Sequence, residues 1–145
     1  MDRSSRPHVV ENHDAALHVW RRLGVRGRTP VHVDTHHDMW NIDERADRVD
    51  IRNYVCQALR EGIGRDVVWV VPDASWAPGR RPVLRRHLRR LMYEYGARAP
   101  IERGDRRLST FLGDTPVLVC ALDTLPACSE PVLLDLDAGP DGPLR

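Results

Sequence analysis

Hydrophobic and polar residues follow one another along the chain in blocks of two kinds. Short apolar runs rich in β-branched residues have the length of strands, whereas longer stretches repeat apolar residues three and four positions apart, as on one face of a helix. The predicted strands are 8–11, 30–34, 66–71, 116–122 and 131–137, and the predicted helices are 14–23, 50–62 and 82–95. This alternation predicts an α/β fold with a mostly parallel sheet covered by helices.

The pattern gives no reason to divide the chain. It contains no internal repeat and no linker, and its length suits one domain, so residues 1–145 are expected to form a single α/β domain. Residues 138–145 are rich in Gly and Pro and are expected to form a loose tail.

Composition and charge narrow the class of protein. The 22 basic residues, all arginine, nearly balance 21 acidic ones, which disfavours a strongly basic nucleic-acid-binding protein. The three cysteines, Cys56, Cys120 and Cys128, have no C-x-x-C spacing, so neither a disulfide framework nor a zinc site is expected. Without an apolar leader or membrane-spanning stretch, we expect a cytoplasmic protein that binds neither nucleic acid nor a membrane.

One stretch concentrates positive charge. Six arginines occur from Arg80 through Arg90, around the helix predicted at 82–95. A solvated outer helix face explains them better than an anion-binding patch, because no aromatic residues are interleaved with the charges. The anion-binding patch stays open as the alternative.

Acidic and histidine residues cluster where predicted strands end. The three clusters are Glu11-Asn12-His13-Asp14, Asp34-Thr35-His36-His37-Asp38 and Asp135-Leu136-Asp137. Open α/β sheets place their ligand sites at the carboxyl ends of the strands, so the three clusters are candidates for one common site. Caps and turn acids on the surface are the simpler explanation for each cluster taken alone.

The spacing within the second cluster makes a geometric demand. In an extended chain Asp34 and His36 point to one side, about 6.6 Å apart, and Asp38 lies about 13 Å from Asp34. Two ions in a binuclear centre are only about 3.5–4 Å apart, so the chain must curl after Asp34 to bring Asp38 back. His32 is expected to face away from its neighbours Val31 and Val33, and the sequence suggests no partner for it.

Converging carboxylates need compensating cations. Asp135 and Asp137 occupy alternate positions after an apolar run and would be costly to bury without positive charge beside them. Two divalent ions would nearly cancel about four negative charges. Oxygen and imidazole ligands favour Mn, Mg or Fe over a structural zinc. An α/β scaffold without metal remains the alternative if the clusters prove scattered.

These motifs resemble those of a known superfamily. The segment 33–39 resembles the D-x-H-x-D motif of the arginase/deacetylase (ureohydrolase) superfamily, 134–137 is similar to its later D-x-D motif, and 11–13 looks like its early histidine segment. A longer resemblance, covering most of residues 8–137, is to the peptide arginases and the uncharacterised protein family to which they belong. It is carried by segments 9–14, 32–40, 51–54, 62–63 and 69–73.

The resemblance implies an arginase-like, three-layer αβα fold and two manganese ions. One ion would be bound by His13, Asp34, Asp38 and Asp135. The other would be bound by Asp34, His36, Asp135 and Asp137, so that Asp34 and Asp135 bridge the two ions. The implied reaction is hydrolysis of the guanidino group of arginine, which releases urea and leaves ornithine. The substrate would be an arginine-containing peptide or a small guanidino compound.

Residues on the loops around the expected metal site are further candidates. Asp38 and His37 are the candidate catalytic residues, with His37 as a proton shuttle, although its place between two ligands favours a structural role. Trp40, Asn41 and Asp73 are the candidate substrate-binding residues. Packing of the loop by Trp40 and capping of a turn by Asp73 are the simpler alternatives.

The chain departs from the arginase pattern at its C-terminal end. Arginases contribute a glutamate that holds the substrate guanidinium well after the D-x-D motif, whereas this sequence continues for only eight residues beyond Asp137. We therefore expect a member that is incomplete at the C-terminus. The alternative function is that of a catalytically inactive relic that binds metal or a partner. Amide deacetylation is disfavoured, because that branch replaces one of these carboxylates and needs a later tyrosine.

Overall fold

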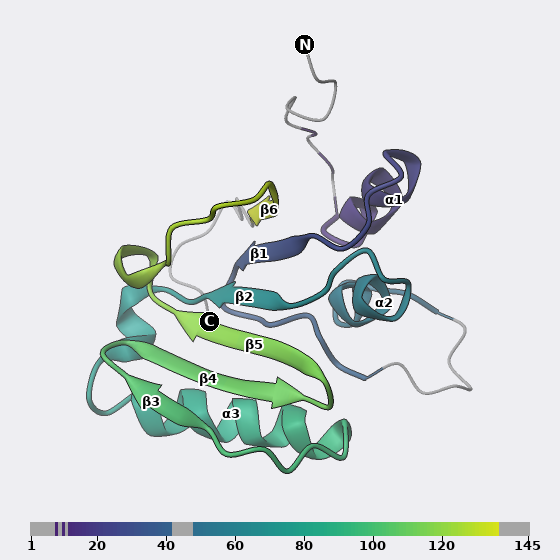
Figure 1. Cartoon of the computed structure of the whole chain (residues 1–145). Coiled ribbons are helices and arrows are strands. Elements are labelled where there is room, and N and C mark those ends of the chain that lie inside the picture. Colours follow the sequence, from purple (N-terminus) through teal and green to yellow (C-terminus); the bar gives the residue numbers. More distant parts are fainter. Residues whose placement is uncertain (1–7, 9, 11, 42–47, 137–145) are drawn as a thin grey trace.

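In a computed structural model of the chain, residues 8, 10, 12–41 and 48–136 are described (Figure 1). These residues form an α/β fold with three α-helices and a mixed six-stranded sheet. The α-helices are α1 (Ala15–Arg22), α2 (Tyr54–Arg60) and α3 (Arg81–Glu94), and the short 3-10 helices are η2 (Asp73–Trp76) and η3 (Leu122–Thr124). The strands are β1 (Thr29–Val33), β2 (Val67–Val70), β3 (Glu102–Gly104), β4 (Arg107–Leu112), β5 (Thr115–Cys120) and β6 (Val132–Leu136).

The sheet has the strand order β3-β4-β5-β2-β1-β6. Strands β5, β2, β1 and β6 are parallel to one another, whereas β3 and β4 are antiparallel additions at one edge. The α/β class is confirmed, and the expectation of a mostly parallel sheet is correct only for these four strands. Their carboxyl ends meet at one edge of the sheet, where the second and third acidic clusters begin.

Most predicted elements form, with shifted boundaries. The helix predicted at 14–23 is α1, which ends before Gly24; this residue has a positive φ of 65° that glycine adopts without strain. The helix predicted at 50–62 is confined to the seven residues of α2. In the strand predicted at 8–11, His8 and Val10 are described and belong to no strand, and the other two residues lie outside the described part, as does the tail 138–145.

The described helices cover one face of the sheet. Trp69, Val119 and Leu108 lie side by side on neighbouring strands and share a large buried cluster with Tyr54 of α2 and Leu88 of α3. Helix α3 runs along the β3–β4 end of the sheet, and α1 and α2 lie near β1 and β2 (Figure 1).

The opposite face of the sheet is not covered by a described helix. It carries a smaller buried cluster of Val31, Val70 and Cys120 and leaves Leu134 and Leu136 each 59% exposed. The expected three-layer arrangement is therefore seen only as two layers in the described residues. None of the described helices is long and apolar enough to cross a membrane.

Helix α3 shows how the sequence pattern produces this packing. Its buried residues, Leu84, Leu88, Leu91 and Met92, recur at the spacing that places side chains on one helix face. Proline at the second helical position is tolerated because the backbone N–H that it lacks has no partner within the first turn. The arginines of α3 consequently face away from the sheet core.

Candidate metal centre

The candidate site lies where β1 ends. Asp34 follows the last residue of β1, and its backbone is held on both sides: its N–H donates to the carbonyl of Val70 (3.2 Å), and its carbonyl accepts from Trp69 Nε1 (2.8 Å). The Asp34 side chain is only 2% exposed. The neighbouring strand β2 thus fixes a buried carboxylate at the carboxyl edge of the sheet.

The chain then curls back, as the spacing of the D-x-H-x-D motif required. The backbone N–H of His36 donates to Asp34 Oδ1 (3.1 Å), closing a tight turn after the strand. Asp38 has a positive φ of 52°, and its carbonyl accepts from the N–H of Val55, the second residue of α2. This turn returns the Asp38 carboxylate to Asp34.

Three side chains form a group able to hold a cation. One ligand atom each from His13, Asp34 and Asp38 lies within 4.8 Å of the others. His13, which precedes α1, places Nδ1 3.5 Å from Asp34 Oδ2. His36 places Nδ1 3.5 Å from the other oxygen of Asp34 and is 68% exposed. Buried carboxylates with an imidazole nitrogen form a donor set that can hold a divalent cation, and Mn²⁺ is one of the ions that such donors suit.

His32 lies between the carboxylates, a role that the sequence analysis missed. Its Nε2 is 3.2 Å from Asp38 Oδ2 and 3.8 Å from Asp34 Oδ2, and its Nδ1 is 3.0 Å from Asp135 Oδ2. The expectation that His32 has no partner is wrong. The available signal was its position two residues before Asp34, which puts both side chains on the same side of the strand.

Asp135 lies at the same edge of the sheet but has different neighbours from the expected ones. It stands opposite His32 in the β1–β6 register, and the Tyr54 hydroxyl of α2 donates to the same Asp135 oxygen that faces His32. Asp135 does not belong to the metal-holding group found among the described residues. Its expected partner in the D-x-D motif, Asp137, lies outside the described residues.

Burial and charge set the protonation of this cluster. Burial alone lowers the pKa of His32, but hydrogen bonds to Asp135 and Asp38 outweigh it and raise the pKa to about 10. Burial raises the pKa of Asp38, whereas at Asp135 the hydrogen bonds from His32 and Tyr54 overcome the effect of burial and lower the pKa. His32 therefore acts as an internal counter-ion between two carboxylates.

His37 faces away from the carboxylates. It is 4% exposed, its Nδ1 accepts the backbone N–H of Met39 (2.9 Å), and its ring meets those of Trp40 and Trp69 edge-on at 4.6 and 5.5 Å. Burial, reinforced by the charge of His32, lowers the pKa of His37 to about 3, so the ring is neutral. These contacts favour the structural role over the proton shuttle.

The candidate substrate-binding residues have mostly structural contacts. Trp40 packs against His37 and lies under the guanidinium of Arg90, which is 5.5 Å from its ring centre. Asn41 joins two helices, because it donates to the carbonyl of Glu94 and accepts from Arg60. Asp73 is exposed at the first position of η2. Asp73 does not belong to the group formed by His13, Asp34 and Asp38.

Comparisons with known proteins add no family assignment. No protein-family model matches the chain, and no curated protein or solved structure matches it either.

Proposed function

We propose that the carboxylate cluster binds divalent metal and that the chain is a binuclear manganese-dependent hydrolase of the guanidino group of arginine, with arginine inside a peptide as substrate. The observation that supports this most directly is the approach of ligand atoms from His13, Asp34 and Asp38 to within 4.8 Å of one another. The resemblance of the surrounding motif to arginases supplies the reaction type.

In this proposal, the residues of the cluster have two roles: holding the metal ions and positioning a metal ligand. As the resemblance implies, His13, Asp34, Asp38 and Asp135 would hold one ion, and Asp34, His36, Asp135 and Asp137 would hold the second. The support for this division is the grouping of His13, Asp34 and Asp38 and the position of His36 beside the other oxygen of Asp34. Manganese, when bound, supplies a Lewis acid that activates water and polarises the guanidino group. His32 and Tyr54 would position Asp135. In the hydrolysis, water cleaves the bond between the guanidino carbon and the side-chain nitrogen of arginine: the oxygen stays on the carbon, which leaves as urea, and the nitrogen takes up the protons, which leaves an ornithine residue in the peptide. A cytoplasmic location belongs to the same proposal, since Cys56 and Cys120 are buried free thiols.

A catalytically inactive metal-binding protein is the second candidate, and one observation favours it. The His32 side chain connects Asp38 with Asp135 and neutralises part of their charge. With Asp135 engaged by His32 and Tyr54, this arrangement accommodates one ion more readily than two. Such a protein would bind manganese with a stoichiometry of one and release no urea.

Metal binding is tested with a matched pair of variants. We expect saturating Mn²⁺ to raise the melting temperature of the wild-type protein by several degrees, because about 100-fold excess over Kd contributes about 2.7 kcal/mol. Asp34→Asn removes a buried ligand and abolishes this shift. Asp114→Asn, a change at an exposed turn residue between β4 and β5, keeps it. An unchanged wild-type melting temperature at saturating Mn²⁺ would remove both candidate functions.

Catalysis is tested by measuring urea and metal content in parallel. A peptide with an internal arginine and free arginine are incubated with the Mn²⁺-loaded protein. The proposal expects two ions per chain and urea release that is faster from the peptide and absent in Asp34→Asn. One bound ion without urea supports the inactive metal-binding protein instead.

A further inference from the structure

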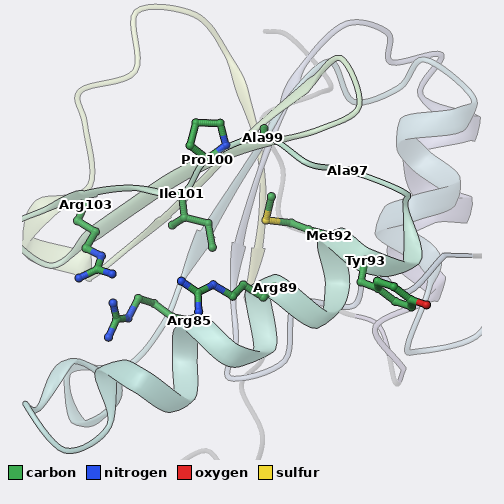
Figure 2. Close-up of a pocket in the computed structure, with 9 residues that line it drawn as sticks. All are labelled: Arg85, Arg89, Met92, Tyr93, Ala97, Ala99, Pro100, Ile101 and Arg103. Atoms are coloured by element: carbon green, nitrogen blue, oxygen red, sulfur yellow. The ribbon is translucent and has the colours of Figure 1, made fainter.

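A second site lies away from the carboxylate cluster, between α3 and the segment that leads into β3. It is a pocket of about 390 Å³, lined by Arg85, Arg89, Met92, Tyr93, Ala97, Ala99, Pro100, Ile101 and Arg103 (Figure 2). Its volume falls within the range of small-molecule pockets, about 300–1,000 Å³.

Three arginines from two elements meet in this pocket. Arg85 and Arg89 are one helical turn apart on α3, and Arg103 is the middle residue of β3. Figure 2 shows their guanidinium groups gathered at one end of the pocket. Within the described part of the chain, no ion pair or side-chain hydrogen bond occupies these three groups, and no acidic residue lines the pocket.

The remaining lining is apolar and lies beside the charges. Met92, Pro100 and Ile101 form a wall, and the Tyr93 ring at the other end is 84% exposed (Figure 2). A ligand that satisfies both parts therefore needs a multiply charged anionic group joined to a small apolar or aromatic group. A single carboxylate would leave most of the arginine charge unbalanced, whereas a phosphate dianion accepts paired hydrogen bonds from several guanidinium groups.

From these features we infer that the pocket binds a small organic phosphate monoester. The phosphate lies among Arg85, Arg89 and Arg103, and the organic group lies on Pro100 and Ile101. Part of the arginine run of α3 is thus a binding surface, because Arg103 of β3 completes it. The site is independent of the proposed hydrolase, since the residues at the C-terminal end of α3 that contact the metal-site loop, namely Arg90, Glu94 and the cap residue Tyr95, do not line the pocket.

Calorimetric titration of the full chain with phenyl phosphate tests the inference. We expect saturable binding at a stoichiometry of one. The affinity is expected to be at least about tenfold higher than for inorganic phosphate, which lacks the apolar group, or for phenylacetate, which lacks the phosphate. Arg89→Gln and Arg103→Gln each weaken the affinity about tenfold or more through loss of a charge-assisted hydrogen bond. Arg86→Gln, which removes an exposed charge on the same helix outside the pocket, leaves the affinity unchanged.

Three results would contradict the inference that the pocket binds a phosphate monoester. Unsaturable binding of phenyl phosphate overturns the inference, as does inorganic phosphate of equal affinity, which would indicate general attraction of anions. An Arg86→Gln variant as weak as Arg89→Gln would show that only the helix charge matters. Melting temperatures of the variants, expected to match the wild type at these exposed positions, verify that the fold is intact.

Discussion

His32 joins three parts of the candidate site through its two ring nitrogens. Nε2 contacts Asp38 and the carbonyl of His36 (2.8 Å), and Nδ1 contacts Asp135 and the Tyr54 hydroxyl. The residue is fully buried, so its charge and hydrogen bonds are screened little by water. In the metal-free protein, the positive charge of His32 therefore neutralises part of the charge of Asp38 and Asp135, as a bound cation would.

This role predicts a large loss of stability in His32→Asn. In metal-free protein the substitution leaves two carboxylates without their counter-ion, and the free energy of unfolding is expected to fall by about 3–5 kcal/mol. Added Mn²⁺ recovers part of this loss by neutralising the same carboxylates. Urea denaturation with and without the metal measures both effects.

His18→Asn is the matched control for this change. His18 is exposed on α1, so its substitution is expected to alter the free energy of unfolding by no more than about 0.5 kcal/mol. Equal losses in the two variants would mean that His32 has no special electrostatic role.

At the scale of single residues, local spacing predicted part of the site. It placed Asp34, His36 and Asp38 in one turn, because strand geometry alone requires the chain to curl after Asp34 if Asp38 is to lie near it. It did not supply Tyr54 or the pairing of His32 with Asp135, since these residues are 22 and 103 positions from His32. Asp135 meets His32 through the β1–β6 register, and Tyr54 meets it through the packing of α2 on the sheet. For His37, its place on the alternate side of the chain favours a structural role, and its contacts with Met39, Trp40 and Trp69 agree with that interpretation.

Among the elements, the connection from α2 to β2 packs closely on the start of β1. A Cβ on Gly64 would lie 3.0 Å from Leu59 Cδ2 and 3.1 Å from Pro30 Cγ. These neighbours belong to the helix and the strand that flank the site, so little space exists for an added methyl group. Glycine is needed here for close approach.

Gly64→Ala is therefore expected to destabilise the protein by about 1–3 kcal/mol through overpacking. Gly79→Ala is the control, because no atom lies within 4 Å of its added Cβ and its φ is not positive. Thermal unfolding of the two variants makes the comparison. A Gly64→Ala melting temperature equal to that of Gly79→Ala would contradict the tight packing.

The elements absent from the predictions are β3 and β4. Strand β4 is not predicted, although Gly113-Asp114 between it and β5 is a typical two-residue hairpin connection. Gly113 has a positive φ of 62°. The three residues of β3 are all exposed and have no apolar alternation, so their sequence carries little strand signal. This hairpin is what makes the sheet mixed.

For the whole molecule, the two faces of the sheet differ in cover. Hydrophobic pattern identifies a strand that is apolar on both sides, as in β2, but it does not say which layer covers each side. Leu133 packs against the helix-covered core, whereas its neighbour Leu134 is 59% exposed on the other face. Leu133 and Leu134, although adjacent in β6, thus lie against the buried core and on the exposed face, respectively.

Replacing each leucine with alanine compares how much the two faces contribute to stability. Leu133→Ala is expected to cost about 2 kcal/mol of stability, and Leu134→Ala less than about 0.5 kcal/mol. Chemical denaturation measures the difference, and the exposed position further predicts that Leu134→Ala reduces binding of a hydrophobic dye to the native protein. A larger stability loss in Leu134→Ala than in Leu133→Ala would show that the second face is covered.

Strand β6 is the outermost strand beside β1, and it carries Asp135 from a point about a hundred residues later in the chain. While the protein is being synthesised, the D-x-H-x-D turn leaves the ribosome long before this strand exists. Until β6 is synthesised, His32 lacks Asp135 as a partner for its Nδ1, and the cluster is complete only when β6 docks. The arrival of the last described strand is thus the moment at which the nascent chain gains its complete set of carboxylate contacts around His32.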